Sequence, residues 1–558
     1  MASTYLQALF PLFVALFFFL KKKEKGLPLL SGLLNKDLVC LVLIFSTFFA
    51  QHTYSQDTIK RPKIGLVLTG GGAKGFAHIG VLKVLEEAGI KIDYIGGTSM
   101  GSVVGGLYAA GYNARQLDSI FSTTNFDELL NDYIPRSYKS FYEKRNGEVY
   151  ALSLPFKKFN VGVPIALSKG LYNYCLLSQL TNHVQNVRDF TQLPIPFVCI
   201  ATDIESGQQV VLNKGFLAQA LLASSAFPTL FSPVEIEGKI LIDGGITNNY
   251  PVDEVRKMGA DYIIGIDVQD GLKNRNSLTE ATRILLQISN LQVIEGMKEK
   301  INQTDLYIKP EVDQYSVISF EKGREIVLKG EEATFSFCDQ INELAQKQHI
   351  PYVKPNLKIS DSIQVDQITI NSLKNYTRAY VIGQLGFNEG TKISFEDLKT
   401  GINKLNATEN FSTIAFKINP HEKGQELEIN LQENEIKTYL KLGLHYDGLY
   451  KSAVLVNLTQ KKSLFKNDVL SIDFGLGDKF RYNFDYYVDN GFYFSFGFRS
   501  RFNQFNKNIS SDFSQTLVNN QPNINTLNID YADFTNQAYV QTIYSRKFLI
   551  GAGVELKH

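Results

Sequence analysis

The feature that most constrains the fold of this chain is the order of elements between residues 64 and 108. An apolar segment, Ile64–Leu68, predicts a buried strand, and a glycine-rich loop, Gly70–Gly75, follows it. A helical apolar period then leads to a second apolar segment, Ile90–Ile95, and to the turn Gly97–Gly101. Small and apolar residues after that turn predict another helix. Strands and helices in this order predict an α/β fold.

The turn at Gly97-Thr98-Ser99-Met100-Gly101 has the pattern G-x-S-x-G. Roughly one chain in five of this length would contain the pattern by chance, so its context decides its meaning. In a nucleophile elbow the serine stands between a strand and a helix, and its oxygen projects clear of the sheet. The helix N-terminus also favours the negative charge of an acyl-transfer intermediate. We therefore predict that Ser99 is a nucleophile and that the Met100 N–H donates to the oxyanion.

The glycine loop before the first helix has two interpretations. Gly71 and Gly72 leave backbone N–H groups uncovered at a helix N-terminus, as an oxyanion hole requires. Gly70, Gly72 and Gly75 also match the dinucleotide fingerprint G-x-G-x-x-G, with Asp93 near the spacing of its ribose-binding acid. Because Asp93 stands early in its strand rather than at the end, dinucleotide binding is the weaker alternative. No Gly-Lys-Ser/Thr follows the loop, which excludes a P-loop.

Further short apolar segments alternate with helical patterns up to residue 350. They predict strands at Pro196–Thr202, Val210–Leu212, Ile240–Ile242 and Tyr262–Ile266. Such alternation indicates a parallel α/β sheet.

A serine nucleophile needs a base, and the sequence offers few candidates. Asp243 comes directly after an apolar strand, and Gly244 and Gly245 leave it accessible, although Asp-Gly is also a common turn dipeptide. His349 would fit the Ser…Asp…His order of α/β hydrolases and stays an alternative. His78 follows the glycine loop on a helix face, where we expect a structural residue.

Three motifs, taken together and in order, resemble those of the patatin-like phospholipase family. They are GGGAKG at Gly70–Gly75, GTSMG at Gly97–Gly101, and DGG at Asp243–Gly245 followed by Asn248–Val252. The resemblance covers residues 61–350. It implies a three-layer α/β domain that hydrolyses acyl esters of lipids with a Ser–Asp dyad.

The resemblance also implies roles for individual residues. Ser99 would be the nucleophile, and Asp243 would accept its proton and return it to the leaving alcohol, so the reaction needs neither a metal nor a cofactor. A free aspartate is a weak base at a pKa near ~3.9, so we expect a shifted pKa for Asp243. The remaining motif residues are Gly70, Gly71, Gly72, Gly75 and Met100 in the oxyanion hole, and Gly97, Gly101, Gly244 and Gly245 in the turns.

Two apolar runs precede residue 60. The first, Tyr5–Leu20, ends in three lysines, and the second, Leu38–Ala50, has a length that suits the h-region of a signal peptide. We predict residues 1–55 to be a signal region with the second run as the export signal. A permanent N-terminal anchor is the alternative.

Two more domains are predicted after residue 356. A β-α-α-β-β order in residues 358–434 resembles a POTRA module, a type of domain that precedes outer-membrane barrels. In residues 436–558 apolar side chains alternate over segments of roughly ten residues, as in Leu440–Tyr446 and Phe492–Phe498. Of the 67 Tyr and Phe residues of the chain, 29 lie in its last third. This alternating pattern is typical of a transmembrane β-barrel, and a soluble antiparallel β-domain is the alternative.

The predicted strands number roughly seven or eight, close to the lower limit for a closed barrel, so we expect an incomplete barrel. The domain order resembles type V secretion proteins and implies export to the outer membrane, with the hydrolase domain periplasmic or surface-exposed. The expected partners are a lipid substrate and a membrane. A net charge of +1 gives no reason to expect nucleic acid. The competing function is outer-membrane transport or assembly with the hydrolase domain as a passenger.

Overall fold

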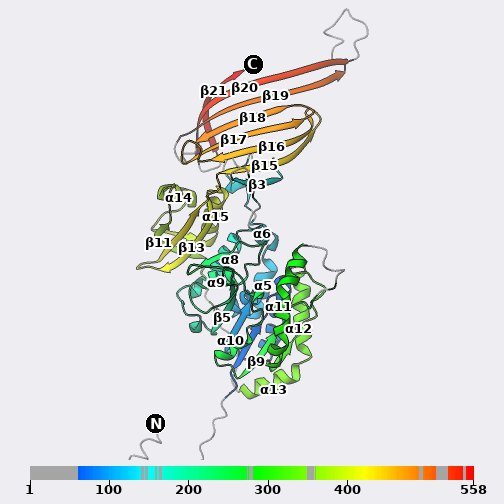
Figure 1. Cartoon of the computed structure of the whole chain (residues 1–558). Coiled ribbons are helices and arrows are strands. Elements are labelled where there is room, and N and C mark those ends of the chain that lie inside the picture. The colour runs from blue at the N-terminus through cyan, green and yellow to red at the C-terminus, as the bar shows by residue number, and fades with distance from the viewer. Residues whose placement is uncertain are drawn as a thin grey trace, which may run out of the picture. The chain divides into compact units, whose positions relative to one another are not determined.

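The computed structural model describes most of the chain from residue 61 onward (Figure 1). The described residues are 61–132, 134–139, 144, 149–157, 160–162, 166–272, 274, 281–348, 357, 360–488, 494–510, 526–544 and 548–558. The predicted signal region, residues 1–55, and His349 lie outside them. The described strands form three β-sheets, of eight, four and nine strands.

The eight-stranded sheet carries the glycine loop and the serine turn. Its strand order is β10-β9-β1-β2-β5-β8-β7, with β6 paired to β5. Five strands are parallel to one another: β1 (Ile64–Leu68), β2 (Tyr94–Thr98), β5 (Phe197–Asp203), β9 (Tyr262–Ile266) and β10 (Leu306–Ile308). Three are antiparallel to their neighbours: β6 (Gln209–Leu212), β7 (Val234–Ile236) and β8 (Lys239–Asp243).

The predicted parallel sheet is confirmed for β1, β2, β5, β9 and β10, whereas β8 runs antiparallel to β5. A two-residue turn causes the reversal between β7 and β8. Glu237 and Gly238 both have positive φ angles, 51° and 77°, which matches the tight turn of a β-hairpin. Asp243, at the end of β8, is consequently brought back beside Ala201 in the middle of the domain.

Helices cover both faces of this sheet, which confirms the predicted three-layer α/β architecture (Figure 1). Ile64, Leu66 and Leu68 of β1 pack in one core with α3, α4 and α12, whereas Val67 packs on the opposite face with α10 and α11. Strand side chains alternate between faces, so two apolar faces require two helical layers. The helices are α3 (Ala77–Glu87), α4 (Met100–Ala109), α5 (Ala114–Thr123), α6 (Phe126–Asn131), α8 (Leu171–Leu180), α9 (Leu217–Ser224), α10 (Val252–Lys257), α11 (Ala281–Asn302), α12 (Gly323–Phe335) and α13 (Cys338–Gln348).

The four-stranded sheet corresponds to the segment with the POTRA-like pattern. Its strand order is β12-β11-β14-β13, and β11 and β14 are parallel. The elements are β11 (Ser362–Asn371), α14 (Arg378–Leu385), β12 (Thr391–Ser394), α15 (Phe395–Ala407), β13 (Phe411–Pro420) and β14 (Gln425–Glu433). The sequence did not predict β12, because four residues directly before a helix are too few to show alternation. The POTRA assignment itself stays a prediction.

The nine-stranded sheet contains the C-terminal strands in sequential antiparallel order. They are β15 (Thr438–Asp447), β16 (Lys451–Lys461), β17 (Asp468–Gly477), β18 (Arg481–Val488), β19 (Ser495–Ser510), β20 (Thr526–Tyr544) and β21 (Phe548–Lys557). Two strands from the α/β domain, β3 (Leu152–Lys157) and β4 (Asn160–Val161), extend the sheet beyond β15.

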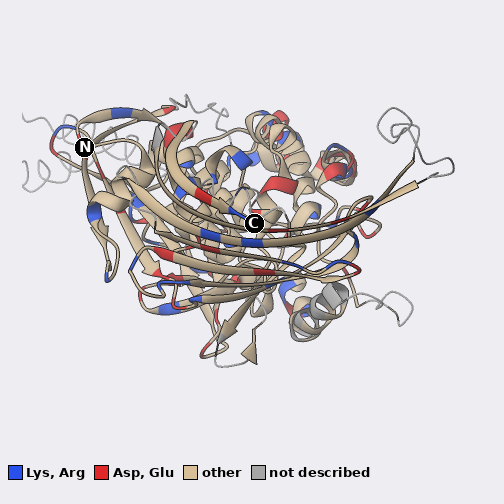
Figure 2. Ribbon diagram, turned by 90° about the horizontal axis from the view of Figure 1, so that it is seen from above, with Lys and Arg blue, Asp and Glu red and all other residues tan. Residues whose placement is uncertain are grey.

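The two faces of this sheet differ in chemistry. On β16, for example, Val454 is 47% exposed, whereas Asn457 is fully buried. Figure 2 shows acidic and basic residues interspersed along the long strands. Apolar side chains on one face and a hydrogen-bonded polar set on the other match the pattern of an outer-membrane sheet. Within the described residues, no helix combines the length and the apolarity that a membrane-spanning helix needs.

Candidate active site

Ser99 occupies a strained turn between β2 and α4. Its φ angle of 54° and ψ angle of −126° are unusual for a residue with a side chain. The two flanking glycines permit the turn: a Cβ at Gly97 would lie 2.5 Å from the Gly101 carbonyl oxygen, and a Cβ at Gly101 would lie 2.4 Å from the Leu68 carbonyl oxygen. The geometry is that of a nucleophile elbow.

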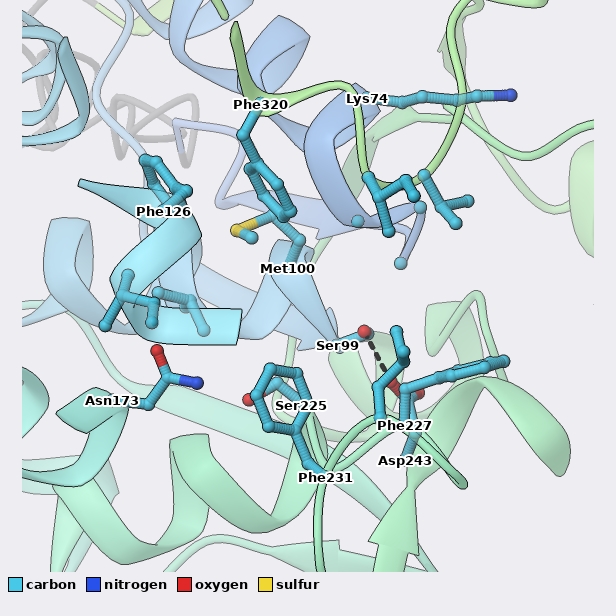
Figure 3. Close-up of a pocket in the computed structure, with 18 of the residues that line it drawn as sticks. Lys74, Ser99, Met100, Phe126, Asn173, Ser225, Phe227, Phe231, Asp243 and Phe320 are labelled. Carbon is cyan, nitrogen blue, oxygen red and sulfur yellow. Dashed lines mark hydrogen bonds between the residues drawn. The ribbon is translucent and has the colours of Figure 1, made fainter. Parts of the chain in front are cut away.

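Asp243 lies within hydrogen-bonding distance of Ser99 (Figure 3). The Ser99 hydroxyl donates to Asp243 Oδ2 at 2.5 Å, and the Gly245 N–H donates to Oδ1 at 2.7 Å. Burial raises the pKa of Asp243 to about 6, and the two hydrogen bonds only partly offset that rise. A carboxylate with this pKa is a stronger base than a free aspartate. The direction agrees with the shift expected for a base near a serine.

A second serine holds the turn in place. Ser99 N–H donates to Ser224 Oγ at 3.1 Å, and that hydroxyl donates in turn to the Ile200 carbonyl at 2.6 Å. Ser224 ends α9 and is fully buried. Ser224 could not be singled out from the sequence, because its contact with Ser99 depends on the packing of α9 beside β5.

The predicted oxyanion residues divide into three groups. Gly71, Gly72 and Met100 line the cavity beside Ser99. Gly70 also lines it, but its N–H is engaged by Asn249 Oδ1 at 2.9 Å. The structure places Gly75 inside the 3₁₀ helix η1 (Gly72–Phe76), where a Cβ would lie 2.4 Å from Met100 Cγ. Gly75 thus permits packing of η1 on α4. The oxyanion role stays a prediction for the first group.

The conformation of the glycine loop depends on a neighbouring segment. Gly72 has a φ of 57°, and a Cβ there would lie 2.2 Å from the Val317 carbonyl oxygen, which also accepts the Ala73 N–H at 2.8 Å. Any side chain at position 72 would therefore displace Val317. The close approach of the two backbones explains a glycine at this position.

Asn248 and Asn249, directly after the DGG motif, connect the loops that carry Ser99 and Asp243. Asn249 binds the backbone of Gly70. The Asn248 carbonyl accepts the Thr98 hydroxyl at 2.9 Å, and its side chain binds Glu254 and Lys300. Sequence reasoning included these asparagines in a motif but gave them no role.

Two histidines near the sequence motifs bind backbone carbonyls elsewhere. His78 Nε2 lies 2.8 Å from the Thr69 carbonyl, and burial lowers its pKa to about 4, so it is neutral at pH 7. His183 Nε2 lies 2.8 Å from the Ala110 carbonyl. The placement of His78 agrees with the structural role expected for it.

The acid of the alternative dinucleotide interpretation is engaged elsewhere. Asp93 Oδ2 accepts the Ile64 N–H at 2.9 Å, at the start of β1. The glycine loop follows the opposite end of that strand. Asp93 therefore stabilises the beginning of the sheet and lies away from the loop that would bind the pyrophosphate.

A cavity of about 190 Å³ opens beside Ser99 and Asp243. Figure 3 shows Met100, Phe126 and Phe320 on one side of Ser99, and Phe227 and Phe231 on the other. The rings of Phe126 and Phe320 stack at 4.5 Å. Most other lining residues are apolar as well, including Val103, Leu107, Leu129, Leu176, Leu177 and Leu180. An apolar pocket with a few convergent polar groups suits a ligand with a hydrocarbon chain.

The charged groups near the glycine loop are paired. Lys74 is almost fully buried and forms an ion pair with Asp270. Its side chain extends away from Ser99 in Figure 3. Its charge is therefore balanced within the domain.

Comparison with known families assigns two parts of the chain. Residues 66–256 match the family model of patatin-like phospholipases, and residues 425–558 match that of the OMP85 superfamily. The protein thus contains a patatin-like phospholipase domain followed by a C-terminal OMP85 domain. This confirms the resemblance drawn from the motifs and the prediction of a barrel-type C-terminal region.

The chain is also similar to individual proteins. It is 29% identical over 290 residues to lysophospholipase NTE1 of Scheffersomyces stipitis, covering 47% of this chain and 17% of that protein. For lysophospholipase NTE1 of Saccharomyces cerevisiae the identity is 26% over 362 residues, with 57% and 19% covered. The chain spans less than one fifth of the length of these two relatives.

Solved structures show weaker similarity. VipD of Legionella pneumophila matches with a TM-score of 0.32 and 14% identity, covering 50% of this chain and 67% of that chain. BamA of Haemophilus ducreyi matches with a TM-score of 0.25 and 11% identity, covering 35% of each chain.

Proposed function

We propose that this protein is a lipid acyl hydrolase that works through an acyl-enzyme on Ser99. The observation that carries the proposal is the 2.5 Å hydrogen bond from the Ser99 hydroxyl to Asp243, at the wall of an apolar cavity. The match of residues 66–256 to patatin-like phospholipases supports the class of reaction. The similar NTE1 proteins are lysophospholipases by name, which supports a phospholipid or lysophospholipid ester as substrate.

In the proposed first half-reaction, Asp243 takes the proton of Ser99 while Oγ attacks the ester carbonyl carbon. The N–H groups of Gly71, Gly72 and Met100 would hold the negative oxygen. Asp243 then gives the proton to the leaving alcohol as the carbon–oxygen bond breaks, which leaves an acyl-enzyme. In the second half, water attacks the acyl carbon and loses its proton to Asp243. Transfer of that proton back to Ser99 Oγ releases the fatty acid.

The pKa of Asp243 supports this dual role. A general base works best when its pKa lies near the working pH. Burial brings the Asp243 pKa to about 6, so the group is ionised at neutral pH and can still hold a proton transiently. The bound Ser99 hydroxyl is already oriented toward the oxygen that would receive its proton.

We also propose that the protein is exported and associates with the outer membrane through its OMP85 domain, with the hydrolase domain in the periplasm or at the cell surface. The match of residues 425–558 and the apolar outer face of the C-terminal sheet support this location. The same match favours the second candidate function, transport or assembly at the outer membrane, in which the hydrolase would be a passenger.

The test uses the full chain in detergent with a fluorophosphonate probe and a lysophospholipid substrate. We expect labelling of the natural protein and of Ser122→Ala, which changes an exposed serine on α5. Ser99→Ala should lose both labelling and turnover, and Asp243→Asn should lose turnover. His349→Ala should keep turnover. Loss of activity in His349→Ala with retention in Asp243→Asn would replace the dyad by a histidine-based site. Absence of labelling in a folded natural chain would refute the hydrolase proposal.

A further inference from the structure

One wall of the cavity beside Ser99 is a face of helix α8. The residues of α8 that line the cavity are Asn173, Leu176, Leu177 and Leu180. Their spacing of three and four residues places them on one side of the helix. Three of the four are leucines, which suit a hydrocarbon chain, whereas the residue nearest the start of the helix carries an amide. The apolar stripe thus begins with one polar side chain.

The amide of Asn173 is available to a ligand. Figure 3 shows the side chain at the cavity, with its amide group directed into it. Asn173 is half-buried, and no hydrogen bond joins its side chain to another group in the part of the chain that the structure describes. Water satisfies an amide in an open cavity, but a bound hydrocarbon chain displaces that water. The amide would then be buried without a partner, which is unfavourable.

Ser225 adds a second polar group to the same cavity. It follows α9, a helix that packs against α8. Figure 3 shows Asn173 and Ser225 on the side of Ser99 away from Lys74. The Ser225 hydroxyl donates to the Leu221 carbonyl at 2.8 Å, so its proton is engaged and its oxygen remains an acceptor.

The chemistry of this pair matches one kind of ligand group. The Asn173 amide can donate a hydrogen bond and the Ser225 oxygen can accept one. The pair therefore complements a hydroxyl group, which accepts and donates at once. A carbonyl or ether oxygen cannot donate, so it would leave the Ser225 oxygen unpaired.

An ionised ligand group fits this part of the cavity less well. The described charged residues of the cavity wall already have partners: Lys74 binds Asp270, and Asp243 binds Ser99. A charge beside Asn173 would therefore be buried without a counter-ion, which is costly. A neutral hydroxyl needs none.

We propose, on the basis of the acyl hydrolase function above, that Asn173 and Ser225 form a hydroxyl-binding subsite in its substrate cavity. The Asn173 amide donates to the oxygen of a substrate hydroxyl, whose proton is donated to Ser225 Oγ. A substrate without the hydroxyl leaves both groups unpaired, so the enzyme is selective for hydroxylated substrates. The hydroxyl belongs either to the acyl chain or to the free glycerol carbon of a lysophospholipid, and the two present the same chemistry.

Measurements of kcat/KM with the full chain in detergent distinguish the two sources. One set of substrates contains nitrophenyl esters of one saturated fatty acid, either unsubstituted or with a single hydroxyl at a different carbon in each ester. The other contains a lysophospholipid and its deoxy analogue, which lacks the free glycerol hydroxyl. We expect a preference of about tenfold for the hydroxylated substrate in one set, as one net hydrogen bond provides.

A preference among the nitrophenyl esters assigns the hydroxyl to the acyl chain. A preference for the lysophospholipid over its deoxy analogue assigns it to the glycerol. No preference in either set would overturn the proposal.

Asn173→Leu removes the amide with little change in side-chain volume. The hydroxylated substrate should lose its advantage, and the unsubstituted substrate should react faster, because no amide is left unpaired. Ser225→Ala should weaken the preference less, since Asn173 remains. Asn131→Leu is the matched control: it changes an exposed amide on α6, outside the cavity wall, and should keep the full preference. An unchanged preference in both Asn173→Leu and Ser225→Ala would overturn the assignment of the subsite.

Fluorophosphonate labelling of Ser99 separates failure of the subsite from failure of the hydrolase. A variant that labels like the natural protein has a folded site, so its substrate preference reports on the side chain that it lacks. If Asn173→Leu does not label, Asn173→Ala and Ser225→Ala decide, since neither adds atoms to the cavity wall. Hydrolysis that depends on Ser99 but shows no preference overturns the subsite alone. A folded natural chain that neither labels nor hydrolyses any of the esters refutes the hydrolase itself.

Discussion

The two large sheets of this protein place their polar side chains in opposite ways. In the hydrolase domain every residue of β1 is buried, and the proposed catalytic residues Ser99 and Asp243 come after or at the end of strands. In the C-terminal sheet polar residues such as Asn457 and Ser471 lie within strands, opposite an apolar face. A sheet covered by helices on both faces has room for chemistry only at its edges, whereas a sheet against lipid keeps its polar groups on one face.

The two sheets also differ in the partners that they provide for a buried carboxylate, as Asp243 and Asp485 show. Asp243 meets one hydroxyl and one backbone N–H, and its pKa rises because burial is incompletely compensated. Asp485, on β18, is equally buried but binds Arg499 at 2.9 Å and Asn483 at 2.8 Å. The first carboxylate has the weak compensation that lets it take up a proton. The second is balanced by a cation and belongs to the framework.

The largest expected effect is that of Ser99→Ala. Removal of the nucleophile should lower kcat by about 10⁴-fold or more, since the residual rate depends only on the oxyanion hole and binding. The protease resistance of the C-terminal sheet should not change, because Ser99 is not part of that sheet. Lysophospholipid turnover and resistance of residues 436–558 to protease in vesicles measure the two responses. Loss of that resistance would mean that the two sheets are not independent.

Asp243→Asn should lower kcat by roughly 10³-fold, because the base is lost while the shape is kept. The same change should stabilise the hydrolase domain at pH 7.5. The folded-state pKa lies above the unfolded value, so the stability of the natural domain falls as the pH rises from 3.8 through about 6. This shift of the Asp243 pKa corresponds to about 3 kcal/mol in the free energy of unfolding.

Urea unfolding of the natural protein and Asp243→Asn at pH 4 and pH 7.5 measures this linkage. We expect a gain in the free energy of unfolding of the variant at pH 7.5 and a much smaller gain at pH 4, where the natural carboxyl is protonated in the folded state and roughly half protonated in the unfolded state. An equal gain in the free energy of unfolding at both pH values would show that the stabilisation does not come from the ionisation of Asp243.

A charge on the apolar face of the C-terminal sheet should affect folding in the membrane and leave catalysis intact. Phe498 on β19 is 41% exposed on that face. Phe498→Arg should cost about 2–4 kcal/mol if the position lies near the bilayer midplane. Urea titration in phospholipid vesicles measures the loss.

Asn503→Lys is the matched control on the same strand. Asn503 lies on the polar face and donates to Asp533 at 3.3 Å, so a lysine there gains a carboxylate partner. We expect a change below about 1 kcal/mol. Equal losses in the two variants would contradict the assignment of the faces.

Asn249→Ala should reduce kcat by about 10–100-fold, because the glycine loop would lose the side chain that fixes Gly70. The KM should change little, since Asn249 contributes only a small part of the cavity wall. Asn249→Asp, which keeps an acceptor for the Gly70 N–H, should retain more activity than Asn249→Ala. The opposite order would argue that the amide group acts on the substrate and not on the loop.

The local geometry of the site could be predicted from the sequence because it depends on neighbours along the chain. The turn at Ser99 needs glycines at positions 97 and 101, and Asp243 stands at the end of a short apolar segment. What could not be predicted depends on contacts through space. Ser224 supports Ser99 only because α9 packs beside β5, and the antiparallel direction of β8 follows from pairing that a short segment does not encode.

Strand β3 shows this limit most clearly. Residues 140–170 contain several basic and aromatic residues, a composition that fits a lid, a lipid-facing edge or a solvated loop. The strand β3 has six residues and contains Pro155, so it shows no clear alternation. Its partner, β15, lies almost 300 residues further along the chain. The pairing was therefore missed.

The smallest predicted effect on activity is its response to acid, which follows from the weak compensation of Asp243. Burial raises the Asp243 pKa to about 6, and only the ionised form can accept the Ser99 proton. The kcat/KM should therefore rise with pH, with a midpoint near 6, and at pH 5 should be about tenfold lower than at pH 7.5. Initial rates with a soluble ester measure the profile without changes in lipid packing. If His349 were the base, its unperturbed pKa near ~6.5 would give a similar midpoint, so the profile alone does not assign the base. Asp243→Glu resolves the ambiguity, since a retained carboxylate in a slightly different position should shift the midpoint, whereas a histidine-controlled profile should keep it.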